Sequence, residues 1–307
     1  ELAHGQYIDP MKRVVCATRI EPPLHPENGE KIIKDFGMWP EKDVEEGWLE
    51  DDFDKYVEEA KVEFEGKITN GCFAPWMMFK KAFMDIGGHD PRFASAREDS
   101  DVFNRLSLGG FELIQSWQSF VYHLTARGGQ FQHGKVTKDE SQKSEEWQKL
   151  MNKSTREFFR KWGTPVLHDN LLKPIVPPKY DIGFVVNNCN EQILETLEPW
   201  CSTIYIDHSF DAKHYIEREQ PNTTVNLDKK ISSIYSNIEN DIEVRFDGSK
   251  LTNQNFNYLV QLSQVLANDK ELEVGSFELD IFEININKIQ TYEKNLIINK
   301  NSSWKNQ

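Results

Sequence analysis

The chain has 307 residues, which is enough for two domains with modest cores. Its 38% hydrophobic content, with eight tryptophans and nineteen phenylalanines, is typical of a globular protein rather than a disordered one. The net charge of −14 argues against nucleic acid or an anionic membrane as a general partner, because both bind clustered lysine and arginine. No stretch approaches the ~18 apolar residues of a membrane span, so we expect no span in this chain.

The four cysteines are scattered along the chain without C-x-x-C spacing. They are Cys16, Cys72, Cys189 and Cys201. This usage is typical of reduced, mostly buried thiols rather than of a disulfide framework or a zinc site. It favours a cytoplasmic protein.

The N-terminal part of the chain predicts a strand, a loop and a helix. Residues 13–18 form a strand-like apolar run. Residues 21–26 are too rich in proline for a helix or a central strand and predict a surface loop. A helical run then covers residues 53–64, after an acidic stretch.

Residues 71–127 carry the most information about function. A short apolar segment, 73–79, precedes a glycine-containing turn at 87–91. The acidic cluster Glu98-Asp99-Ser100-Asp101 then opens an apolar-periodic helix, which the glycine pair at 109–110 ends. Carboxylates in the first turn of a helix lie beside unpaired N–H groups and the positive end of the dipole, so they remain ionised.

Two strand-like runs follow this helix, at 111–114 and 120–122, and the second ends on His123. A polar helical stretch is predicted for residues 138–162. Residues 172–178, LKPIVPP, predict a stiff, extended linker with few apolar contacts between the two halves of the chain.

From residue 180 the pattern alternates between strands and helices. Strands are predicted at 181–187, 203–207, 242–246 and 274–286, and helices at 192–200 and 253–266. This alternation indicates an α/β domain with a largely parallel sheet. Asp207 and Asp247 follow two of these strands, at the edge where α/β domains place ligands, but both fit ordinary loop chemistry.

The order of features within 71–127 resembles the acceptor half of a GT-A glycosyltransferase, closest to family 2 of inverting sugar transferases. In that family a GG-x-D-x-x-F turn precedes an ED-x-D cluster on a helix, and a downstream strand can end in a metal-binding histidine. The turn is matched by Gly87, Gly88, Asp90 and Phe93. The cluster is matched by Glu98, Asp99 and Asp101, and the end of the strand by His123.

This resemblance implies a partial, Rossmann-like GT-A domain over residues 1–135, its C-terminal or acceptor half. A helical segment and proline-rich linker, 136–179, and a second small α/β domain of unknown role, 180–298, complete the predicted α/β architecture.

A GT-A domain begins with the strands and helices that bind the nucleotide, followed by an acidic DxD motif for the ion on the diphosphate. Here a single strand-like run precedes the loop. Asp51, Asp52 and Asp54 resemble such a motif, but a solvated helix start is the simpler interpretation. We therefore expect an N-terminally truncated transferase that is inactive as this fragment.

The implied function is inverting transfer of a sugar from a nucleotide-sugar donor to a hydroxyl of a glycan or other acceptor, with Mn²⁺ or Mg²⁺ as cofactor. Asp99 is implied as the general base that takes the proton of the acceptor hydroxyl. The alternative for Asp99 is a helix N-cap, a role that Ser100 or Asp101 fills equally well. Glu98, the second catalytic candidate, orients the base or binds a sugar hydroxyl, or is a surface carboxylate.

His123 is the implied metal ligand, and Trp76, Asp101 and Arg127 are the substrate-binding candidates. Trp76 is expected at the edge of the site and Arg127 on diphosphate oxygens. Each of these residues also has a purely structural interpretation. Trp76 would fill the core, and Asp101 would bind backbone N–H groups of its loop. Arg127 and His123 would be ordinary surface side chains. A non-enzymatic carbohydrate- or protein-binding remnant is the second function that the sequence leaves open.

Overall fold

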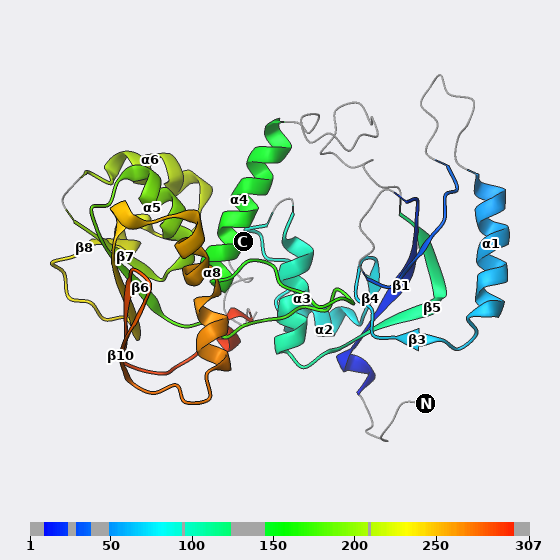
Figure 1. Ribbon diagram of the computed structural model, residues 1–307. Coiled ribbons are helices and arrows are strands. Elements are labelled where there is room, and N and C mark those ends of the chain that lie inside the picture. The colour runs from blue at the N-terminus through cyan, green and yellow to red at the C-terminus, as the bar shows by residue number, and fades with distance from the viewer. Residues whose placement is uncertain are drawn as a thin grey trace.

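Figure 1 shows the computed structural model of the chain, which contains two α/β units with helix α4 (Glu145–Trp162) between them. The structure describes residues 9–23, 29–37, 49–93, 96–123, 145–207 and 210–297. Both units are built on a sheet with parallel and antiparallel pairs, so the predicted α/β class is confirmed. Among the described residues, no helix has the length and apolar character needed to cross a bilayer.

The first sheet has the order β2-β1-β5-β3, and β4 also pairs with β1. Its strands are β1 (Arg13–Glu21), β2 (Lys31–Ile33), β3 (Ile68–Thr69), β4 (Trp76–Met77) and β5 (Glu112–Tyr122). Strand β1 runs parallel to β2 and β5, whereas β3 and β4 are antiparallel to their partners. The carboxyl ends of β1 and β5 therefore meet at one edge, where Ile20 pairs with Tyr122.

Strand β5 corrects the prediction of two separate strand-like runs. It is one strand whose register with β1 shifts between Ala17 and Thr18, which pair with Ser116 and Phe120. Trp117 lies in the skipped segment, and its indole Nε1 donates to Thr69 Oγ1 at 2.9 Å. The irregularity accommodates polar residues that interrupted the apolar pattern without ending the strand.

Helix α1 (Glu50–Glu63) contains the residues that resemble a DxD motif. Asp51, Asp52 and Asp54 are all exposed on this helix, which lies along the first sheet on the side away from the second unit (Figure 1). The simpler interpretation, a solvated acidic helix start, is confirmed.

Helices α2 (Lys80–Asp85) and α3 (Glu98–Leu108) complete the first unit. The helix predicted after the acidic cluster is confirmed as α3, and its Val102 and Leu106 are fully buried in a core cluster with Val14 of β1. This packing fixes the first turn of α3 over the carboxyl edge of the sheet.

The second sheet has the order β10-β11-β9-β6-β7-β8, in which β9, β6, β7 and β8 are parallel. Its strands are β6 (Ile182–Asn187), β7 (Thr203–Ile206), β8 (Ile231–Ser233), β9 (Ile242–Asp247), β10 (Gly275–Leu279) and β11 (Phe282–Ile286). The helices are α5 (Glu191–Leu197), α6 (Lys213–Glu219), α7 (Leu227–Lys230) and α8 (Asn253–Asn268). Short 3-10 turns cover Pro10–Lys12, Glu198–Trp200, Gln220–Asn222, Gly248–Lys250 and Glu293–Leu296.

The sequence-based prediction for this unit holds for β6, β7, β9, α5 and α8. The run at 274–286 is instead an antiparallel hairpin of β10 and β11, because the chain turns at Asp280, where φ is +55°. Helices α6 and α7 and strand β8 were not predicted, since each is short and lacks a full period of apolar residues.

Helix α4 packs against both units. Its Phe158 and Trp162 are buried with Phe93 of the first unit, while its Phe159 stacks on Trp200 of the second at 4.1 Å between ring centroids. Apolar contacts therefore connect the two halves through α4, in contrast to the expectation of few such contacts.

The sequence predicts an extended linker over residues 172–178, but its first residues fold back in a tight hairpin, where the N–H of Ile175 donates to the carbonyl of Leu167 at 2.9 Å. The turn of this hairpin is pinned to the first unit. The N–H of Gly29 donates to the carbonyl of Asn170 at 3.1 Å, and the N–H of Cys72 donates to the carbonyl of Leu171 at 3.1 Å. The segment is therefore a wall of the first unit rather than a free spacer.

Candidate functional site

A pocket of about 360 Å³ lies at the carboxyl edge of β1 and β5. Asp99 and Ser100 of α3 line it, together with His123, which directly follows β5. Arg19 of β1 and the pinned segment, residues 166–174, form other walls. Two residues that the sequence singled out for chemistry, Asp99 and His123, thus share one pocket of a size that holds small ligands.

Asp99 is half-buried in the first turn of α3. Its Oδ1 accepts hydrogen bonds from the backbone N–H of Ser100 at 2.6 Å and from Ser100 Oγ at 3.3 Å. The N-cap position is Arg97, and within the described residues no side-chain cap is formed there. Asp99 is therefore not the N-cap residue, the position that was the alternative to a chemical role, although it satisfies one N–H of the first turn.

The backbone before Asp99 is held in an unusual conformation. Ala96 and Arg97 have φ values of +66° and +71°, a left-handed region that costs residues with a β-carbon free energy. Arg97 is anchored there by a bond from its Nε to Thr155 Oγ1 of α4, at 3.2 Å. Such strain is concentrated at functional sites in many proteins, and here it sets the position of the Asp99 carboxylate.

A buried ionic group supports the other side of the pocket. Glu21 is completely buried and accepts from Arg19 Nη1 at 2.7 Å, from Lys31 Nζ at 2.8 Å and from His123 Nδ1 at 2.8 Å. These four residues are called the Glu21 cluster below. Burial alone would raise the pKa of Glu21, but the bonds from His123 and Lys31 and the charge of Arg19 outweigh it and lower this pKa to about 2.

The ionised Glu21 also fixes the tautomer of His123. A carboxylate can only accept, so His123 Nδ1 carries the proton of their shared hydrogen bond. In the neutral imidazole the lone pair is then on Nε2. Histidines that bind metals commonly have this arrangement, with the second ring nitrogen donating to a carboxylate.

The remaining predicted site residues lie elsewhere. Asp101 was expected to bind substrate or hold its loop, but it is fully buried beneath α3, where it accepts from Arg105 Nε at 2.8 Å and from Trp162 Nε1 at 3.0 Å. It also pairs with Lys161. Asp101 is two positions after Asp99, so its side chain leaves α3 on a different face and points toward α4. Asp101 is therefore a packing residue.

Trp76 is half-buried against the core and does not itself line the pocket, although it packs behind the lining residue Phe103. Its ring packs on Phe103 with centroids 5.0 Å apart, next to the buried cluster of α3 and β1. Phe73 provides the aromatic wall instead, with the Arg19 guanidinium 3.5 Å from its ring centroid. Glu98 lies beside the pocket with its Oε2 buried and unpartnered among the described residues. Arg127 falls outside the described residues.

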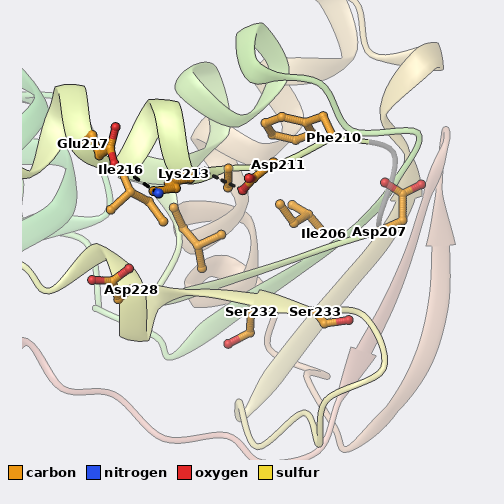
Figure 2. Close-up of a pocket in the computed structure, with 12 residues that line it drawn as sticks. Ile206, Asp207, Phe210, Asp211, Lys213, Ile216, Glu217, Asp228, Ser232 and Ser233 are labelled. Carbon is orange, nitrogen blue, oxygen red and sulfur yellow. Dashed lines mark hydrogen bonds and ion pairs between the residues drawn. The ribbon is translucent and has the colours of Figure 1, made fainter.

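A second, larger pocket of about 750 Å³ belongs to the second unit (Figure 2). It lies at the carboxyl ends of β7 and β8, with Asp207 at one end and Lys213 and Glu217 of α6 along one side. Lys213 Nζ is 3.8 Å from Glu217 Oε1, and both side chains are largely exposed. Its ionic groups are thus solvated, unlike the buried, paired groups of the first pocket, which is therefore the stronger candidate for chemistry.

A divalent cation in the first pocket would need several oxygen or nitrogen ligands from the surrounding side chains. Within the described residues no group of three histidine, cysteine or carboxylate side chains could hold a metal ion. The carboxylate of Glu21 is already occupied by three partners. Among the described residues that line the pocket, the side chains that could bind a cation are then His123, His168 and Asp99. The described residues do not form a complete cation site.

No protein-family model and no curated protein sequence matches the chain. The functional assignment therefore depends on the residues of the first pocket.

Proposed function

We propose that the first pocket is the acceptor side of a glycosyl-transfer site, with Asp99 as the general base. The observation that supports this most is that Asp99, at the start of α3, and His123, directly after β5, line the same pocket. The resemblance to inverting GT-A transferases predicts this pair, and the pocket lies at the carboxyl edge of a largely parallel arrangement of β2, β1 and β5.

The proposed reaction is a single displacement. An acceptor hydroxyl in the pocket gives its proton to Asp99 while its oxygen attacks the anomeric carbon of the donor sugar. The nucleoside diphosphate leaves with the bonding electron pair, and the configuration at the anomeric carbon inverts. Ser100 holds Oδ1 of Asp99, so Oδ2 is the oxygen that takes the proton.

His123 and the Glu21 cluster would form the donor side of this pocket. A divalent cation, Mn²⁺ or Mg²⁺, would neutralise the diphosphate of a nucleotide-sugar when bound, and His123 Nε2 is its candidate ligand in this chain. The chemistry assigned to Asp99 does not depend on that ion.

The first prediction tests the base. In the natural protein that contains this chain, Asp99→Asn is expected to lower transfer from nucleotide sugars by roughly 10²–10⁴, the usual contribution of a general base. Asparagine keeps the size and the acceptor oxygen but cannot take the proton. The measurement is the initial rate of sugar transfer to a panel of glycan acceptors, alongside donor affinity, which should stay nearly constant.

Asp85→Asn is the matched control, because Asp85 is an exposed carboxylate of α2 paired with Lys81. It should transfer sugar at the wild-type rate. If Asp99→Asn also kept the wild-type rate, the base would lie elsewhere, with Glu98 as the next candidate. Sugar binding without any transfer in the wild type would favour the carbohydrate-binding alternative.

A further inference from the structure

Arg19 has an unusual set of contacts for an arginine inside a protein. Its side chain is 5% exposed and lines the first pocket. Nη1 is bonded to Glu21, but Nε and Nη2 are both buried without a hydrogen-bond partner among the described residues. Buried charged donors that remain unpaired are rare and call for an explanation, such as a ligand that completes them.

The two unpaired nitrogens form one edge of the guanidinium. Nε–H and Nη2–H point in parallel, which is the geometry that binds both oxygens of a carboxylate or phosphate at once. Glu21 occupies Nη1, and the ring of Phe73 covers one face at 3.5 Å. The plane of the guanidinium is therefore fixed before any ligand arrives.

The charge around Arg19 also favours an anion. Within the Glu21 cluster, one carboxylate faces two permanent cations, Arg19 and Lys31. Burial lowers the pKa of Arg19 even though the charge of Glu21 acts to raise it. Asp99 and Arg97, which also line the pocket, carry opposite charges. The pocket therefore has an excess of positive charge beside the open edge of Arg19.

We propose that the Nε/Nη2 edge of Arg19 is an oxyanion site, which receives a carboxylate or phosphate group of the substrate through two parallel hydrogen bonds. This inference rests on the proposed function, because it specifies the chemical class of substrate that the same pocket takes. The oxyanion belongs either to the diphosphate of the donor or to an acidic group on the acceptor.

Leu172 lies next to this edge. A β-carbon at Gly29 would lie 2.7 Å from Leu172 Cδ1 and 3.1 Å from Arg19 Nη2, so both side chains converge on this glycine. Leu172 lines the pocket and has a φ of +64°. An oxyanion reaches Nε and Nη2 when the Leu172 side chain turns away from Gly29.

The test is isothermal titration calorimetry of the 307-residue chain with three probes, in the presence of a metal chelator. Inorganic pyrophosphate represents the donor, methyl glucuronide represents an acidic acceptor, and methyl glucoside is the neutral match of the glucuronide. We expect at least one anionic probe to bind, and to bind more tightly than the glucoside. Binding of pyrophosphate alone assigns the edge to the donor, and binding of glucuronide alone assigns it to the acceptor.

Variants identify Arg19 as the group responsible. Arg19→Gln and Arg19→Lys should both raise the Kd of the bound anion roughly tenfold or more, because lysine keeps the charge but lacks the fork. Leu172→Ala should lower the Kd of the anion, because the smaller side chain leaves more room beside Arg19. Arg13→Gln, on the same strand but paired with Glu112, is the control and should bind like the wild type. Arg19→Lys keeps a cation beside Glu21. If Arg19→Gln does not fold, the Kd of the anion for Arg19→Lys tests whether binding requires the guanidinium.

The proposal is overturned if the wild type binds neither anion more tightly than the glucoside, or if both Arg19 variants bind as tightly as the wild type. Asp99→Asn separates this outcome from the proposed function, since it should bind the anion normally while losing transfer. If anion binding depends on Arg19 but the natural protein that contains this chain transfers no sugar, the oxyanion site is supported and the transferase is refuted. Sugar transfer that depends on Asp99 but not on Arg19 would support the transferase and refute the oxyanion site.

Discussion

At the scale of single residues, the pocket depends on Glu21. This buried carboxylate holds Arg19, Lys31 and His123 in place, and its side chain is not exposed at all. A carboxylate whose pKa is lower in the folded protein stabilises the fold above its unfolded pKa and stops doing so as the pH falls. The contribution of Glu21 to the free energy of unfolding should therefore be fully present above pH 4.5 and disappear as the pH approaches 2.

Glu21→Gln tests this assignment. The variant should be less stable than the wild type at pH 7, by on the order of 3 kcal/mol, and the difference should shrink below pH 4.5. Denaturant unfolding at several pH values measures it. Glu58→Gln, an exposed carboxylate paired with Lys61 on α1, is the control, and a pH-independent difference for Glu21→Gln would contradict the account.

The position of a single side chain could be predicted from the sequence where it depends on neighbouring residues alone. The first-turn position of Asp99 follows from the helix that the sequence indicates, and its place in a pocket follows from packing of that helix on β1. Asp101 could not be placed in this way, because its partners Lys161 and Trp162 lie about sixty positions further along the chain. Arg19 was missed since a single arginine in a strand has no local signature.

At the scale of elements, α4 is the helix that connects the two cores. Lys161 is 1% exposed and its Nζ lies 2.8 Å from Asp90 Oδ2, in the turn that precedes α3. It also pairs with Asp101 of α3. Burial lowers the pKa of Lys161, although these two carboxylates act to raise it.

Removing this ammonium should destabilise the first unit strongly. Lys161→Met leaves two buried carboxylates with less compensation, and breaking such buried pairs typically costs 3–5 kcal/mol. Thermal unfolding measures the loss against Lys149→Met, an exposed position on the same helix. Equal melting temperatures for the two variants would show that Lys161 does not hold α4 on the first unit.

Elements with a complete period of apolar residues were predicted correctly, as β6 and α8 show. Elements defined by a turn were not. The hairpin of β10 and β11 reads as one continuous run, because Asp280 turns the chain without a glycine or proline.

At the scale of the whole molecule, the two units are coupled through α4. Arg160 of α4 bonds Glu198 of the second unit, with Nε 3.0 Å from Oε1 and Nη2 2.6 Å from Oε2. Burial acts to raise the pKa of Glu198, but the charge of Lys230 and the hydrogen bonds from Arg160 outweigh it and lower this pKa to about 2. The same helix packs on the first unit, so the structure joins two cores that the sequence predicted as separate.

Arg160→Met should weaken this coupling. The wild type is expected to unfold in one transition, and the variant in two, because the second unit would keep its own core but lose its most buried ionic contact with α4. Arg156 of α4, which pairs with Glu198 and Glu219, would remain. Differential scanning calorimetry distinguishes the two cases. A single transition that merely shifts to lower temperature in the variant would contradict the coupling through Arg160.

The proposed chemistry of the first pocket is a single displacement with Asp99 as the base. The most direct test is the anomeric configuration of the product, read from proton NMR coupling constants immediately after transfer by the natural protein that contains this chain. The account predicts a configuration opposite to that of the donor sugar, and its formation should require Asp99. A product that retains the donor configuration would contradict this mechanism, because a single in-line displacement always inverts the carbon that is attacked.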